Sequence, residues 1–158
     1  MNQVGKSVKT MNRKWSALGV VALVMLGLTV GCRHTAARMD AAYLSQVHLS
    51  HFVMSESSNL ADGKVTYLDG QVTNAGTKTL VGVHVRVIFR NAAGEASQNT
   101  TMPLDLIRAR EPYIDTEPMR ASPLKPGEVR DFRLIFDQVT ADWDGQYPQV
   151  TVESAETR

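Results

Sequence analysis

Residues able to carry acid–base, metal or nucleophilic chemistry are few and scattered in this 158-residue chain. The four histidines are His34, His48, His51 and His84, and the single cysteine is Cys32. His48 and His51 lie three apart on an expected strand, so their side chains leave opposite faces and do not form a metal pair. The chain has no His-Glu-x-x-His motif, no cysteine cluster, no phosphate loop and no Gly-x-Ser-x-Gly elbow. We therefore expect no enzyme, no metal and no cofactor.

The acidic segment Asp142-Trp-Asp-Gly145 is the remaining candidate for a metal site. Two carboxylates beside a glycine could help to hold calcium, but only a fragment of the EF-hand spacing is present. A structural role is favoured, in which Trp143 caps the core and Asp144-Gly145 turns the chain.

The single cysteine lies at the end of a distinctive N-terminal segment. Four basic residues, Lys6, Lys9, Arg13 and Lys14, precede an uncharged apolar run from Trp15 to Gly31. A basic start, an apolar middle and a small residue at the end are typical of an export signal. Thr29-Val-Gly-Cys32 resembles the bacterial lipobox, although Thr29 stands where leucine is preferred. The resemblance implies that the chain is cut before Cys32 and that lipid is attached to its thiol.

Two alternatives to lipid attachment remain open for this segment. It could stay uncleaved as a membrane anchor, or an ordinary signal peptidase could release a soluble product. We assign residues 1–32 to a signal peptide or membrane anchor, 33–42 to a tether and 43–158 to the folded domain. A helical turn over residues 36–42 is the alternative to the tether.

The charge of the chain after Cys32 excludes some partners. That part carries 13 of the 17 basic residues and all 16 acidic residues, which gives a net charge of −3. A nucleic-acid-binding domain needs a basic stripe, so we expect no nucleic acid. The expected location is the extracytoplasmic face of the bacterial cell envelope, where the N-terminal anchor attaches the protein to the membrane.

Alternating hydrophobicity predicts an all-β domain. In residues 80–90, Val83, Val85, Val87 and Phe89 alternate with polar and charged residues, the pattern of a half-buried strand. Further strands are expected over residues 46–55, 64–73, 95–102, 128–137 and 149–153, with turns at Asn74–Lys78 and Leu124–Gly127. We predict an immunoglobulin-like antiparallel β-sandwich of about seven strands, preceded by the signal or anchor helix.

Residues 108–126 interrupt this rhythm. They contain Pro112, Pro118, Pro123 and Pro126, and proline blocks pairing inside a sheet. The segment is expected to form either a long surface connection or an edge segment.

Three blocks of the sequence carry a family resemblance. They are Leu68-Asp-Gly-Gln-Val-Thr-Asn-Ala-Gly76, Val83-His-Val-Arg-Val-Ile-Phe-Arg-Asn91, and Leu124-Lys-Pro-Gly-Glu128 with Phe132-Arg-Leu-Ile-Phe-Asp137. Together they resemble the FxLYD-like extracytoplasmic domains of bacteria and related domains of unknown function. The resemblance implies a membrane-tethered immunoglobulin-like sandwich with no catalytic residues to carry over.

The expected function is that of a tethered protein-binding or scaffold module. Such a domain would offer a sheet edge or the proline-rich segment to a protein partner. Two alternatives remain: a sensor that holds a small ligand between the sheets, and an enzyme with an unrecognised site.

Overall fold

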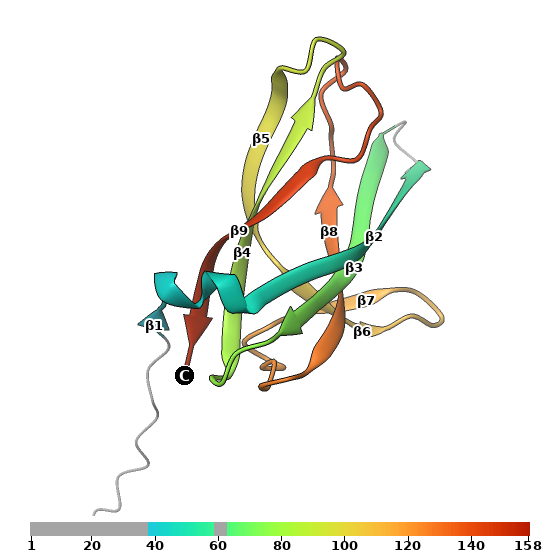
Figure 1. The fold of residues 1–158 in the computed structure, drawn as a ribbon. Helices are drawn as coiled ribbons and strands as arrows, with labels where there is room; N and C mark the ends of the chain where they lie inside the picture. Colours follow the sequence, from blue (N-terminus) through green and yellow to red (C-terminus); the bar gives the residue numbers. More distant parts are fainter. Residues whose placement is uncertain (1–37, 59–62) are drawn as a thin grey trace, which may run out of the picture. The chain divides into compact units, whose positions relative to one another are not determined.

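The computed structural model describes residues 38–58 and 63–158, which form two antiparallel sheets (Figure 1). One sheet has the order β1 (Arg38–Met39), β9 (Gln149–Thr157), β4 (Leu80–Arg90), β5 (Ala96–Pro103). The other has the order β2 (Val47–Ser58), β3 (Lys64–Asn74), β8 (Val129–Phe136), β6 (Asp105–Ala109), β7 (Asp115–Pro118). A 3-10 helix, η1 (Ala41–Gln46), joins β1 to β2. The predicted antiparallel β-sandwich is confirmed, while the predicted N-terminal helix lies outside the described residues.

The strands differ from the predicted set mainly in their short members. The described residues form nine strands, and the three that the pattern did not show are β1, β6 and β7, with two, five and four residues. β6 and β7 form a hairpin within the proline-rich region, and β7 is the outer strand of its sheet. The edge segment expected there is therefore present.

The core lies between the two sheets, where alternate residues of each strand meet. Val83, Val85, Val87 and Phe89 of β4 are all buried, as their alternation predicts. Phe132, Leu134 and Phe136 of β8 face them from the other sheet. Burial of such side chains is the main stabilising term for this fold, because the described residues include no disulfide.

A β-bulge changes which residues of β2 face the core. The pairing with β3 shifts between Ser50 and Val53, and His51 has a positive φ of 54°. On a regular strand Val53 would share a face with Val47 and Leu49. The extra residue reverses the alternation, so that Phe52 packs on the core and Val53 is 59% exposed.

A buried polar corner joins η1 to the turn after β3. The Tyr43 hydroxyl accepts a hydrogen bond from the Lys78 N–H at 2.8 Å and lies 2.9 Å from Asn74 Oδ1, to which it can donate. The Asn74 amide donates to the carbonyls of Lys78 and Leu124, and its oxygen accepts from the Gly76 N–H. A Cβ on Gly76 would lie 2.0 Å from the Tyr43 hydroxyl oxygen, so this close approach requires glycine.

The beginning of the described chain lies against the sandwich. β1 pairs with the last residues of β9, and the Asp40 N–H donates to the Ala155 carbonyl at 2.8 Å. Residues 38–42 of the segment assigned to the tether thus form β1 and the start of η1.

Candidate binding surface

The residues singled out for chemistry in the sequence do not converge in the structure. Cys32 and His34 lie outside the described residues. His48 and His51 line different hollows, one beside β9 and the other beside Asp69. Within residues 38–58 and 63–158, no group of three or more His, Cys, Asp or Glu side chains could hold a metal ion.

The acidic turn has the structural role expected for it. Trp143 packs edge-on against Phe89, with ring centroids 5.4 Å apart. The Asp144 carboxylate accepts the Gln146 N–H at 2.9 Å, and Gly145 has a positive φ of 79°. The carboxylate of Asp144 thus stabilises the turn that holds Trp143 over the core.

No helix in the described ranges is both long and apolar enough to cross a membrane.

The two sheets are closely packed around side chains such as Phe89 and Phe132, which are fully buried. A hollow beside His84 has a volume of about 130 Å³, and a groove between β2 and β9 has a volume of about 460 Å³. Pockets for small-molecule ligands usually measure roughly 300–1,000 Å³, so only the groove is within that range.

One side of the sandwich is open between β9 and β2. In an immunoglobulin domain the neighbouring strands are A-B-E-D in one sheet and G-F-C in the other. Here β2-β3-β8-β6 and β9-β4 have the corresponding neighbours, and β1 occupies the G position only beside Glu156 and Thr157. In the described chain, no strand pairs with residues 149–154 of β9 on the side away from β4.

The backbone groups of Val150 and Val152 point into this open position. Successive residues of a strand direct their N–H and C=O groups to alternate sides. The Val83 carbonyl accepts a backbone hydrogen bond at 2.9 Å from the residue that follows β5, so Val85 and Val87 also face β5. Their partners across the ladder, Val152 and Val150, therefore turn their N–H and C=O groups away from β4.

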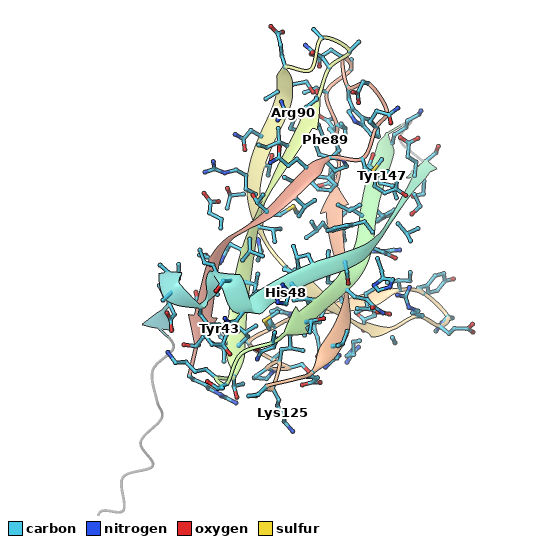
Figure 2. The ribbon with its side chains drawn as sticks, in the orientation of Figure 1. Tyr43, His48, Phe89, Arg90, Lys125 and Tyr147 are labelled. Carbon is cyan, nitrogen blue, oxygen red and sulfur yellow. The ribbon has the colours of Figure 1, made fainter. Side chains whose placement is uncertain are left out.

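A groove with both apolar and polar lining residues lies beside this edge. Its lining residues come from η1, β2 and β9: Leu44, Ser45, Val47, His48, Leu49, Phe52, Val150, Thr151 and Val152. Figure 2 shows His48 on β2 where that strand leaves η1. The only ionisable side chain in the lining is His48. Leu49, Phe52, Val150 and Val152 pack against the core but are only half buried, because nothing in the described chain covers their outer sides.

Two contacts mark the ends of the groove. At one end lies η1, next to the hydrogen bond between Asp40 and Ala155. At the other end the backbone N–H of Met54 donates to the Tyr147 hydroxyl oxygen at 3.4 Å (Figure 2). The open edge therefore spans the six residues from Gln149 to Ser154, roughly 20 Å at the usual rise of a strand.

The other sheet edges carry features that discourage pairing. Proteins commonly protect edges with bulges, prolines, charges and short strands. β2 has its bulge, β5 ends at Pro103, and β7 has four residues with two carboxylates and Pro118. Residues 149–152 of β9 contain no charge and no proline, while the pairing with β4 shifts between Val152 and Ser154 and Glu153 is charged. The stretch from Gln149 to Val152 is therefore the least protected part of these edges.

The outer face of the five-stranded sheet carries an ionic network. Arg133 donates to both oxygens of Asp69, at 2.6 and 2.9 Å, and its guanidinium lies 4.5 Å from the centroid of the Tyr67 ring. Arg110 donates to Asp131 at 2.7 Å, and Gln71 donates to the same carboxylate at 3.2 Å. The hydrogen bond from Arg110, assisted by that from Gln71, holds the pKa of Asp131 below its usual range.

The lowered pKa of Asp131 predicts a pH-dependent contribution to stability. A carboxyl whose pKa is lower in the folded state stabilises the fold above the unfolded-state pKa, near 3.9, and loses that contribution as the pH falls. Asp131→Asn should be less stable than the wild type by about 0.2–1 kcal/mol at pH 7, the usual range for exposed ion pairs. Urea titrations from pH 7 to pH 2.5 should show this difference shrinking below about pH 5. A stability difference that is constant with pH, or that Arg110→Gln does not reproduce, would contradict the view that the Arg110 hydrogen bond lowers the pKa of Asp131.

The fold and the open edge define the class of this protein: a β-sandwich domain that lacks most of one edge strand. A family model described as "Protein of unknown function (DUF2393)" matches residues 7–154, and the chain belongs to that family. No curated protein and no solved structure matches the chain. The resemblance to FxLYD-like domains stays a prediction.

The groove is the feature that the sequence did not reveal. The sequence predicts Val150 and Val152 on a short final strand, and it places His48 on a strand without a metal-binding partner. A local signal existed, since the β-branched residues of β9 are free of charge and proline. The sequence alone does not show that the neighbouring strand position is empty.

Proposed function

We propose that this protein is a membrane-tethered extracytoplasmic module that binds another protein through the open side of its sandwich. The observation that carries the proposal is the edge of β9, which no strand of the described residues pairs over residues 149–154, beside a groove lined by Leu49, Phe52, Val150 and Val152. Sheet edges of this kind recognise extended segments of other proteins through main-chain hydrogen bonds. Binding is favoured over catalysis because the backbone groups of Val150 and Val152 that face away from β4 are suited to pairing with another strand.

Support for the tether comes from the sequence. The basic residues, the apolar run and Cys32 follow one another as in a lipoprotein signal. Two or three acyl chains hold a protein stably at a membrane, since each buried methylene contributes about 0.8 kcal/mol. We infer that Cys32 carries the lipid and that the sandwich is displayed outside the cytoplasm of a bacterial cell.

Replacing Cys32 by serine tests the tether. Cys32→Ser should abolish labelling by an alkyne fatty acid and shift the protein out of the acylated membrane fraction. Thr29→Leu, which restores the preferred lipobox residue, is the matched control and should keep the label. Unlabelled wild-type protein that stays in the membrane would support the uncleaved anchor instead.

The binding role is tested by a charge placed in the groove. Val150→Lys should lower the yield of cross-linked partner in intact cells at least tenfold, because a lysine on an edge strand opposes pairing. Thr100→Lys is the matched control, since Thr100 is also half buried and lies on the other edge of the same sheet. Thermal melts of both variants separate lost binding from lost folding. The proposal fails if the wild type captures no partner, or if both variants capture it equally.

A further inference from the structure

The geometry points to a single extended strand of a partner protein as the occupant of the groove, paired antiparallel to β9. This inference rests on the proposed function and specifies the form of the partner. β1 already pairs antiparallel with β9 at Glu156 and Thr157, in the same strand position. After Met39 the chain leaves that position through η1, and Figure 1 shows η1 leading across to β2. The partner strand continues the position that β1 begins.

The length of the open edge sets the length of the occupant. Between the Asp40–Ala155 hydrogen bond and the Met54–Tyr147 contact, β9 offers Gln149 to Ser154. Five or six residues of a strand fill this distance at about 3.3 Å per residue. An α-helix satisfies its own backbone groups and cannot pair with those of Val150 and Val152.

The lining of the groove sets the chemistry of the occupant. Alternate side chains of the incoming strand would lie over the half-buried Leu49, Phe52, Val150 and Val152. The side chains of the incoming strand at these positions are apolar, because a buried charge without a partner is costly. The intervening side chains would face solvent beside Thr151 and Glu153, where polar residues are tolerated. The occupant is thus a short segment of alternating apolar and polar residues without proline.

A second copy of this chain suits the groove poorly. In the described chain, β5 reads Ala-Ser-Gln-Asn-Thr-Thr-Met-Pro and offers no alternating apolar row, while β7 has only four residues. β2 is interrupted by its bulge. β9 itself has the right pattern, but η1 and β1 lie along the same edge of any second copy. A partner of different sequence therefore fits better.

Photo-cross-linking from the edge tests the inference on the full chain in intact cells. A photoreactive amino acid replaces Gln149 or Thr151, which are exposed beside the open position, and Asn99 on β5 serves as the control. The two β9 probes should reach one partner segment, and the cross-linked residue should move by two positions towards the partner's N-terminus from Gln149 to Thr151. The Asn99 probe should not reach that segment.

A peptide of the cross-linked segment then tests the backbone pairing. Methylation of the amides that face β9 should weaken its binding to the purified domain at least tenfold, and methylation of the alternate amides should have little effect. Cross-links to separate segments of the partner, or to a second copy of this chain, would overturn the inference. Capture of a partner by a general cross-linker but by neither β9 probe would also overturn it and leave the proposed function intact. Capture by no method would overturn both.

Discussion

Replacing Phe89 by alanine is expected to lower the free energy of unfolding by about 3–5 kcal/mol. Phe89 is fully buried on β4 and joins the two sheets through an edge-to-face contact with Phe136, with ring centroids 5.0 Å apart. It also supports Trp143. Alanine at this position loses the transfer free energy of the ring and leaves a cavity between two aromatic neighbours. Urea titration at pH 7 measures the change.

The matched control for Phe89 is Ile135→Ala. Ile135 lies next to Phe136 on β8 but is 43% exposed on the outer face of its sheet. Its truncation should cost less than about 1 kcal/mol, because surface substitutions have small effects. Phe136→Ala should lower the free energy of unfolding by about as much as Phe89→Ala does. Equal and small effects at Phe89 and Ile135 would mean that the aromatic contact is not part of the stabilising core.

Replacing Asn74 by alanine is expected to lower the free energy of unfolding by about 1–3 kcal/mol, although Asn74 is polar. The side chain is fully buried. Without its amide, the carbonyls of Lys78 and Leu124 and the N–H of Gly76 lose a hydrogen-bond partner. The Leu124 carbonyl still accepts from the Leu80 N–H, and the Lys78 carbonyl lies 2.9 Å from the Tyr43 hydroxyl. The main loss is therefore that of the Gly76 N–H, and one unsatisfied group costs about 1–3 kcal/mol. Chemical denaturation of the variant provides the measurement.

Two further substitutions test whether the loss of stability comes from the hydrogen bonds around Asn74 or from the loss of any asparagine. Asn99→Ala, on the exposed edge of β5, should change stability by less than about 0.5 kcal/mol. Tyr43→Phe removes the hydroxyl that bonds to Asn74 and Lys78, and its effect should not add to that of Asn74→Ala. Additive losses would show that the two residues stabilise the fold independently.

Much of the sandwich could be predicted because its signals are local. The alternation in β4 and β8 indicates which side chains are buried, and Pro126 and Gly127 mark the turn before β8. Glycine inside a strand, as at Gly70, is typical of a bulge or a close approach, and a Cβ there would lie 2.6 Å from the Phe132 ring. Each of these features depends on neighbours within a few residues or on one face of one strand.

The predictions fell short where distant parts of the chain meet. Tyr67 and Leu68 are both large side chains of β3, but Tyr67 lies on the outer face beneath the Arg133 guanidinium and only Leu68 is buried. The bulge at His51 exposes Val53. The corner of Tyr43 and Asn74 links residues 31 apart in sequence, and no local pattern indicates such a contact.

The sequence by itself determined the β class, the main strands and the basis for assigning Cys32 to a membrane anchor, because periodicity and the order of charged and apolar residues are properties of short segments. Only the tertiary structure decided which strand edge stays open. Pairing depends on where separate strands come to lie, and β1 leaves the side of β9 after two residues. The candidate binding surface follows from that early departure, because no strand of the described residues pairs with the outward-facing backbone groups of Val150 and Val152 beside the groove.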